Sequence, residues 1–232
     1  MQQVIQIDLN GVNGYLLKKE EKFILIDTGG HMFLDKEFSN RRNELERALL
    51  EKGVNEHNLE LIILTHGDND HVCNAKYLRD KFHSRIAMHE GDVFMVEQAK
   101  SDCYKLNSNY QSLLLKLIFR LMNSKIQILM DKVYDEFEVF TPDLLLKDQD
   151  NLSKFGFDGI IFHMPGHTEG SICILDTQGN LLCGDLFANN KKPSLAVNAQ
   201  NFSILKTSAK KIMTHHITKI YPGHGNPYEI EQ

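Results

Sequence analysis

Short apolar runs followed at once by histidine and aspartate are the feature of this chain that most restricts its fold. The richest example is the apolar run at residues 61–64, which precedes residues 65–71, with the sequence THGDNDH and four candidate metal ligands. Residues 165–167 (PGH), 184–185 (GD) and 222–225 (PGHG) also follow short β-rich runs. Clustered histidine and aspartate cost desolvation free energy unless a cation satisfies them, so packing alone does not explain this density. The four segments predict a two-metal hydrolytic site built on the ends of strands.

Apolar periodicity predicts an alternation of strands and helices on both sides of a central segment. The predicted strands are residues 4–7, 14–17, 22–27, 61–64, 85–89, 159–163, 171–176, 180–183 and 217–221. The predicted helices flanking them are residues 40–52, 75–82 and 202–216. In the first helix Leu45, Leu49 and Leu50 are expected to share a buried face, and Gly53 is expected to end it. This alternation is typical of a layered α/β fold.

Residues 91–150 interrupt that rhythm and are predicted to form a helical insertion in one domain that spans residues 1–232. Residues 92–99 and 109–122 have helical patterns. In the second of these, apolar residues surround most of the helix and only Lys116 and Arg120 interrupt them. Such a helix suits internal packing, a lid over the substrate or a homodimer interface. We expect the insertion to cover the metal site or to form a subunit interface.

Composition excludes several classes of protein. A net charge of −5 in 232 residues is unlike the basic surface of a nucleic-acid-binding protein, so the expected partner is a small-molecule substrate. The four cysteines form no CxxC pair, which indicates reduced thiols and a cytoplasmic protein. The first residues lack the pattern of a signal peptide, and no apolar run reaches the about 18 residues of a membrane-spanning helix.

The polar segments together resemble the motifs of the metallo-β-lactamase superfamily. The resemblance rests on five motifs in order along nearly the whole chain: LIDTG at residues 25–29, HGDNDH at 66–71, PGHTEGS at 165–171, LCGD at 182–185 and YPGHG at 221–225. It implies an αββα sandwich of two mixed β-sheets flanked by helices, with the site at one edge of the sheets.

The resemblance also implies the ligands of two divalent metal ions. The first ion would take His66, position 68 and His167. The second would take Asp70, His71 and His224, with Asp185 bridging the pair. Zinc is the expected metal, with iron or manganese as alternatives. Two-metal sites hold a hydroxide that attacks a carbonyl or phosphoryl centre, and Asp70 is the expected catalytic residue that orients it.

Position 68 departs from the superfamily, because aspartate stands where the motif HxHxDH has its second histidine. A third carboxylate lowers the net charge of two divalent ions, their ligands and one hydroxide from +1 to 0. The bound water should therefore be less acidic, and harder metals such as iron or manganese should be favoured. The flavodiiron branch of the superfamily has glutamate at this position and binds iron, although this chain lacks its flavodoxin-like extension. Asp68 could also point to solvent and leave the first site poorly occupied.

Simpler interpretations exist for single residues. Asp27 could hydrogen-bond to the ligand loop or could only form a strand-end turn. Cys73 is expected to be a packing residue in a helix. Five other histidines are expected on the surface or in the core and not at the metals, namely His31, His89, His163, His215 and His216.

These observations predict a metal-dependent hydrolase that uses a bridging hydroxide on a small ester, thioester or lactone. One alternative is an iron-dependent oxidoreductase related to flavodiiron proteins. Another is a non-catalytic protein that binds a metal or a ligand.

Overall fold

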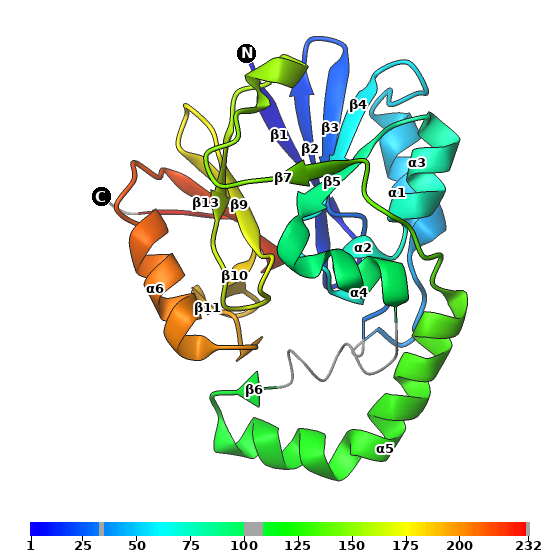
Figure 1. Ribbon diagram of the computed structural model, residues 1–232, viewed down its shortest axis with the longest axis vertical. Coiled ribbons are helices and arrows are strands. Elements are labelled where there is room, and N and C mark those ends of the chain that lie inside the picture. Colours follow the sequence, from blue (N-terminus) through cyan, green and yellow to red (C-terminus); the bar gives the residue numbers. More distant parts are fainter. Residues whose placement is uncertain (33–34, 100–108, 231–232) are drawn as a thin grey trace.

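Two mixed β-sheets pack face to face in the computed structural model, which describes residues 1–32, 35–99 and 109–230. The first sheet has the order β1-β2-β3-β4-β5-β7 and the second the order β14-β13-β10-β9-β8, with β11 paired to β10. Figure 1 shows α1 and α3 on the outer side of the first sheet and α6 on the outer side of the second. The αββα sandwich expected from the motifs is confirmed.

The strands of the first sheet are β1 (Gln3–Asp8), β2 (Asn13–Lys19), β3 (Lys22–Ile26), β4 (Leu59–Ile63), β5 (Ile86–His89) and β7 (Leu144–Leu146). Those of the second are β8 (Ile160–His163), β9 (Ile172–Leu175), β10 (Asn180–Asn189), β11 (Ser194–Leu195), β13 (Lys219–Gly225) and β14 (Tyr228–Glu229). A short separate pair joins β6 (Asn109–Tyr110) and β12 (Asn198–Ala199).

The helices are α1 (Arg42–Glu51), α2 (Asn69–Val72), α3 (Ala75–Phe82), α4 (Val93–Gln98), α5 (Leu113–Glu136) and α6 (Phe202–Ile212). Two 3₁₀ helices, η1 (Glu90–Asp92) and η3 (Leu152–Phe155), complete the described elements.

Alternating side chains explain why the sheets pack in layers. In β3, Ile24 and Ile26 join the apolar core between the two sheets, while Phe23 and Leu25 join the core under α1 and α3. Successive side chains of a strand point to opposite faces, so a strand buried on both sides reads as a continuous apolar run. β3, β4 and β5 pair in parallel, so their carboxyl ends share one edge of the sheet. That edge receives the histidine and aspartate segments.

Most predicted elements agree with the structure, but several details were wrong. Leu50 is half exposed and does not share the buried face of Leu45 and Leu49. β10 continues past Cys183 to Asn189, and β14 follows the strand that was expected to be last. Both differences arise because pairing with a neighbouring strand extends or creates a strand whose own apolar pattern is weak.

The helical insertion contains a longer helix than its pattern predicts. Residues 109–110 form β6, and the helix begins after Ser112 and ends at Glu136, not at Met122. The hydroxyl of Ser112 accepts a hydrogen bond from the backbone N–H of Leu115, which caps the helix. Within residues 1–32, 35–99 and 109–230, no helix is both long and apolar enough to cross a lipid bilayer. Of the cysteines, Cys73, Cys173 and Cys183 are buried free thiols, and Cys103 lies outside the described residues.

Candidate metal centre

The loop after β4 brings four candidate ligands to the edge of the first sheet. The chain leaves β4 at Ile63 and enters α2 at Asn69, so His66 and Asp68 lie on the turn and Asp70 and His71 on the helix. A side chain at Gly67 would clash with its neighbours, because an added Cβ would lie 2.8 Å from the sulfur of Met95 and 3.1 Å from the Cβ of Asp92. The residue does not adopt a left-handed conformation, so close packing and not backbone freedom requires glycine here.

The remaining candidate ligands come from the second sheet. His167 lies on the connection between β8 and β9, and His224 lies in β13. Asp185 was expected at a strand end, but it lies inside β10 at an irregularity in the pairing with β13. Gly184 there has a φ of 48°, and an added Cβ would lie 2.5 Å from the hydroxyl oxygen of Thr65.

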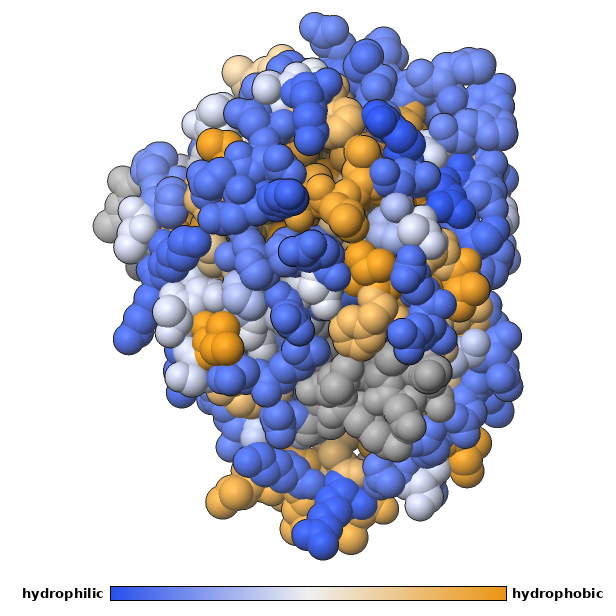
Figure 2. Space-filling model, viewed as in Figure 1, coloured by the Kyte–Doolittle hydropathy of each residue, from blue (hydrophilic) through white to orange (hydrophobic). Residues whose placement is uncertain are grey.

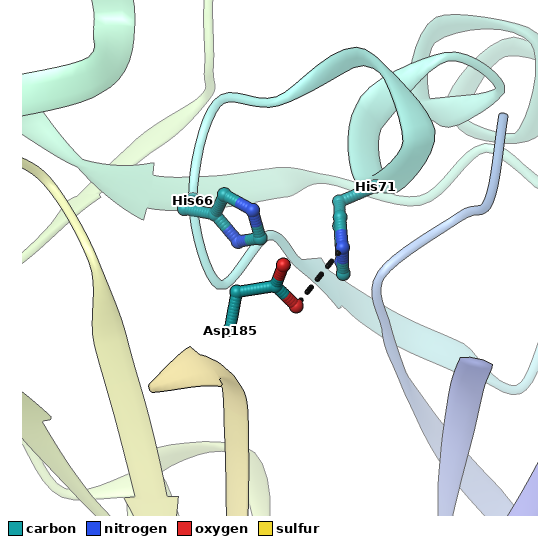
Figure 3. Close-up of side chains that lie close together, drawn as sticks. All are labelled: His66, His71 and Asp185. Carbon is teal, nitrogen blue, oxygen red and sulfur yellow. Dashed lines mark ion pairs between the residues drawn. The ribbon is translucent and has the colours of Figure 1, made fainter. Parts of the chain in front are cut away.

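The structure brings all seven predicted site residues together: His66, Asp68, Asp70, His71, His167, Asp185 and His224. They form three overlapping groups of three, and within each group the ligand atoms lie within 4.8 Å of one another. Figure 3 shows one group, in which His66 and His71 from the loop face Asp185 from β10.

Asp68 belongs to one side of this cluster. Its Oδ2 lies 3.0 Å from Nε2 of His167 and 3.6 Å from Nε2 of His66. The carboxylate therefore occupies the third corner of the first group and does not point away from it. Asp68 stands where the usual superfamily motif has a histidine, so a carboxylate takes the place of an imidazole in the first group.

Asp70 and Asp185 complete the other side. Oδ2 of Asp70 lies 3.4 Å from Nε2 of His224 and 3.9 Å from Nε2 of His71. The two oxygens of Asp185 contact different histidines. Oδ1 lies 3.4 Å from Nε2 of His71. Oδ2 lies 3.2 Å from Nε2 of His224 and 3.7 Å from Nε2 of His167. Asp185 is therefore the carboxylate placed between the two sets of histidines.

All four imidazoles are held at Nδ1, which leaves Nε2 directed into the cluster. Nδ1 of His167 donates to the carbonyl oxygen of Asn198 at 3.0 Å, and Nδ1 of His224 donates to that of Gly11 at 2.6 Å. A carbonyl oxygen only accepts, so both Nδ1 atoms carry hydrogen and both Nε2 atoms have a free lone pair in the neutral ring. This arrangement of outer hydrogen bonds is typical of histidines that ligate metals.

Asp27 and Thr65 hold the other two histidines. Oδ2 of Asp27 accepts from Nδ1 of His71 at 2.8 Å and from the hydroxyl of Thr65 at 2.7 Å. Because the Thr65 hydroxyl donates to Asp27, its oxygen is left to accept from Nδ1 of His66, 3.0 Å away. Of the two interpretations of Asp27, the structure supports the hydrogen bond to the ligand loop.

The cluster has the properties expected of a cation site. Nε2 of His66 and Oδ1 of Asp185 are buried and have no hydrogen-bond partner. The Nε2 atoms of His71 and His224 lie 3.5 Å apart, and two lone pairs at that distance repel unless a proton or a cation lies between them. The residues present therefore fit two metal ions, which would satisfy these inward-facing atoms.

Charges within the cluster shift the pKa values of its members. Burial acts to lower the pKa of His167, but its hydrogen bond to Asp68 and the charge of Asp185 outweigh burial and raise the pKa to about 9. Burial acts to raise the pKa of Asp185, but His224 and His71 hold it well below its usual range. Protons and metal ions compete for the same Nε2 atoms, so metal binding must release protons.

Asp92 is a site residue that sequence reasoning missed. Its buried carboxylate accepts from the backbone N–H of Gly67 at 2.8 Å, the hydroxyl of Thr168 at 2.6 Å and the backbone N–H of Gly170 at 2.7 Å. It therefore ties the loop that carries His66 to the loop that carries His167. Burial raises the pKa of this carboxyl, although the bond from Thr168 opposes the shift. Its place at the start of the predicted helix at residues 92–99 gave no local signal of this role.

The other histidines lie outside the cluster, as expected. His89 and His163 stack on each other with ring centroids 3.8 Å apart. His31 is buried and lies 3.3 Å from the carboxylate of Glu136. Nδ1 of His215 contacts the carbonyl of Ile212 at the end of α6, and His216 follows it at the surface.

The sequence resembles known proteins along most of its length. Residues 7–224 match the profile of the metallo-β-lactamase superfamily. A Drosophila melanogaster protein described as a β-lactamase-like protein 2 homolog is 24% identical over 221 residues, which are 95% of this chain. The chain spans 61% of the length of that relative.

Solved structures share the fold. A metallo-β-lactamase family protein from Thermus thermophilus aligns with a TM-score of 0.68 at 20% identity, covering 98% of this chain and 74% of its own. A protein solved in a di-iron-bound form, TTHA1623, aligns with a TM-score of 0.63 at 20% identity and covers 98% and 94%. AidC, a dizinc quorum-quenching lactonase solved with the product N-hexanoyl-L-homoserine, aligns with a TM-score of 0.57 at 19% identity and covers 92% and 72%.

Proposed function

Because this chain belongs to the metallo-β-lactamase superfamily of dinuclear metallo-hydrolases, we propose that it hydrolyses a small ester, thioester or lactone. The observation that carries the proposal is the cluster of seven ligand side chains, in which Nε2 of His66 and Oδ1 of Asp185 are buried without a hydrogen-bond partner. A cluster built only for stability would pair these atoms with hydrogen-bond donors from the protein.

Two sets of residues would hold the metals. His66, Asp68 and His167 form the first set, and Asp70, His71 and His224 form the second. Asp185 lies between the sets and is the proposed bridge. When bound, two divalent ions supply a hydroxide at neutral pH and polarise the substrate carbonyl. We propose zinc as the metal, with iron or manganese as the alternatives to be tested by metal analysis.

The cluster is open to substrate on one side. The side chains of Asp68, Asp70 and His224 are 18%, 24% and 14% exposed, whereas the side chain of His71 is fully buried. Substrate therefore approaches past the two loop aspartates. Asp70, the more exposed of the two, is proposed to accept the proton that water loses as it becomes the hydroxide that adds to the carbonyl carbon. It then returns this proton to the leaving oxygen or sulfur.

The lactonase among the structural neighbours supports the choice of substrate classes. AidC is a dizinc quorum-quenching lactonase solved in complex with a product, N-hexanoyl-L-homoserine. At 19% identity this likeness shows a shared fold and not a shared activity. Lactones are therefore the first class to assay.

The test is a hydrolysis panel of aryl esters, acyl thioesters and lactones with metal-reconstituted protein. We expect turnover of at least one class, lost on chelation and restored by metal. Asp185→Asn should abolish it. Asp176→Asn is the matched control, because Asp176 is an equally buried aspartate in the turn before β10, where it accepts from the backbone N–H of Gln178. A protein that binds two metals and hydrolyses no member of the panel would contradict the proposal.

Asp68 favours a second candidate, an iron-dependent oxidoreductase. Asp68 gives the cluster three carboxylates where the usual superfamily motif has two, and oxygen ligands favour harder metals than zinc. Metal analysis after aerobic and anaerobic purification separates the two. Iron as the dominant metal, with a reversible redox signal and no hydrolysis, would support this candidate in place of the first.

A further inference from the structure

The first half of α5 directs large apolar side chains into solvent. Leu113, Leu117 and Leu121 are 81%, 54% and 77% exposed, and Leu114 and Ile118 beside them are also exposed. At 100° per residue these positions form one continuous stripe along the helix. We name residues 113, 114, 117, 118 and 121 the outward stripe of α5.

Packing among the described residues does not account for the outward stripe. The fully buried apolar residues of α5 are Ile126, Met130 and Val133, which form a cluster in its second half. These positions lie on the face of the helix opposite the stripe. An ordinary surface helix would place polar side chains where the stripe lies. None of the described residues covers the stripe, so it can accept an external partner.

The charges around the outward stripe are all of one sign. Lys116, Arg120 and Lys125 are the charged residues between positions 109 and 130, and no carboxylate occurs among these 22 residues. The whole chain has a net charge of −5, so this basic segment stands out from its surroundings. Carboxylates return only at Asp131, in the second half of α5, which packs on the protein.

Two of these cations line a hollow on the flank of the helix. The hollow has a volume of about 370 Å³, and its polar lining includes Lys116, Arg120 and Asn123. Neither Lys116 nor Arg120 forms an ion pair within the part of the chain that the structure describes. Two unpaired cations and an amide beside an apolar stripe suit a phosphate group attached to an apolar tail.

The outward stripe lies at the same end of the molecule as the metal centre. β6, directly before α5, pairs with β12, and its Tyr110 lies opposite Asn198. The carbonyl of Asn198 is the group that holds Nδ1 of His167. Figure 1 shows α5 along the lower end of the molecule, and Figure 2 shows orange and blue side chains gathered there in the same view.

We propose that the outward stripe of α5 and its flanking cations dock the protein on the surface of an anionic lipid bilayer. The apolar stripe enters the interface while Lys116 and Arg120 bind lipid phosphates, as in amphipathic helices that lie in the membrane plane. Charge decides against a second copy of this chain as the occupant. Two copies joined through the stripe would bring two sets of unpaired cations together, whereas anionic headgroups neutralise them.

The experiment is co-sedimentation of the whole, metal-reconstituted chain with two kinds of vesicle. One kind contains phosphatidylcholine only, and the other contains phosphatidylcholine and phosphatidylglycerol at a ratio of 3:1. We expect at least about fivefold more bound protein on the anionic vesicles, with the difference reduced at high salt because the attraction is screened. The readout is binding, so it does not depend on the proposed hydrolase activity.

Two double variants separate the apolar and the charged contributions. Leu117→Gln with Leu121→Gln should remove binding to both kinds of vesicle. Lys116→Gln with Arg120→Gln should remove only the preference for anionic vesicles. The matched control is Leu50→Gln with Leu145→Gln, two leucines that are 50% and 51% exposed on other elements. This control should bind as the unchanged protein does. Circular dichroism and metal content establish that each variant is folded.

Several outcomes would overturn the proposal. Failure of the folded protein to bind either kind of vesicle would do so, as would loss of binding in the Leu50 and Leu145 control. If vesicle binding is absent, sedimentation equilibrium decides the alternative. A dimer that the Leu117 and Leu121 variant converts to a monomer would identify a second copy of the chain as the occupant. Binding of equal strength to both vesicle types would remove the anionic headgroup from the proposal.

Discussion

The metal centre and the outward stripe of α5 both reverse the usual distribution of side chains, but in opposite senses. At the metal centre, histidines and aspartates that normally seek water are buried, and each imidazole is held by an outer hydrogen bond. On α5, leucines that normally seek the core are exposed, and nothing in the described chain covers them. Buried polar groups and exposed apolar groups both cost free energy. Each region therefore indicates something outside the polypeptide, a cation in one and an apolar surface in the other.

The two regions also differ in how tightly the fold holds them. The metal centre is held by contacts among β4, α2, β10 and β13, which belong to both sheets. Among the described residues, the first half of α5 has no fully buried side chain, and its contacts include the half-buried ring of Phe119 stacked on that of Tyr110. Substitutions at the metal centre should therefore propagate, and those on the outward stripe should not. The following predictions test this difference, beginning with the largest expected effect.

The largest effect is expected from Asp185→Ala. This change removes the carboxylate that lies between the two sets of histidines, so metal content should fall from two ions per chain to one or none. Hydrolysis should fall below detection, a larger loss than the roughly 10–100-fold that removing an outer partner of a ligand costs. Elemental analysis and the hydrolysis panel measure both quantities. Retention of two tightly bound metals would show that Asp185 is not a shared ligand.

Asp27→Asn should have the next largest effect. Oδ2 of Asp27 accepts from Nδ1 of His71 and from the hydroxyl of Thr65, and Oδ1 accepts from the backbone N–H of Thr65. Asparagine has only one accepting side-chain atom, so at least one of these bonds is lost and the two imidazoles lose their orientation. We expect metal affinity to fall by roughly 10–100-fold, as is typical for outer partners of metal-ligating histidines. Competition with a chromophoric chelator measures the affinity, and Asp176→Asn serves again as the control. Equal affinity in Asp27→Asn and wild type would mean that packing alone orients His71.

Asp68→His should restore the superfamily motif and raise the charge of the site by one. We expect tighter zinc binding and an acid limb of the pH–rate profile moved down by about one unit, since charge around zinc-bound water moves its pKa by up to about two units. Asp68→Ala should leave Asp70, His71 and His224 holding one ion. If both variants keep the wild-type metal stoichiometry and an unchanged pH–rate profile, Asp68 does not ligate the metal.

The raised pKa of His167 predicts proton release on metal binding. Its pKa in the folded metal-free protein is about 9, above the roughly 6.5 of an unfolded chain. This group therefore stabilises the metal-free protein fully below about pH 6.5, and the contribution disappears as the pH rises through about 9. At about pH 7.5 metal binding should release about one proton from His167, and well above about pH 9 almost none. Calorimetry in buffers of different ionisation enthalpy counts these protons, and a count that does not fall with rising pH would contradict the assignment.

The smallest effect is expected on the outward stripe itself. Leu121→Gln should change the free energy of unfolding by no more than about 0.5 kcal/mol, because a substitution at an exposed position removes few contacts. Met130→Ala, on the opposite face of the same helix, should cost about 2 kcal/mol or more because it leaves a cavity. Chemical denaturation of both variants gives the comparison. Similar losses in both would mean that the stripe packs on the protein in solution.

Much of the sandwich could be predicted from local sequence. Alternating or continuous apolar runs in the sequence locate β1, β3 and β4. The layers that cover one or both faces of these strands require apolar residues at those positions. The helix at Ala75–Phe82 matches its prediction at both ends, since Leu78 and Phe82 define its buried face. All seven candidate ligands were identified from their motifs, and the structure places them in one cluster.

Other features depend on contacts that local sequence does not contain. The helical pattern at residues 109–122 includes Asn109 and Tyr110, which instead form β6 because they pair with β12, about 90 residues later. Asp92 has no local feature that distinguishes it from an ordinary helix-starting aspartate. Its role arises because Gly67, Thr168 and Gly170 converge on it in space.

The sequence by itself determined which residue types could hold metals, the order of the strands that carry them and the apolar character of α5. These follow from chemistry and periodicity, which are local properties of the chain. Only the tertiary structure decided that Asp68 turns toward His167, that Asp185 lies between the two sets of histidines and that the leucines of α5 face outward. Those outcomes depend on which distant segments meet, and that is set by the packing of the two sheets as a whole.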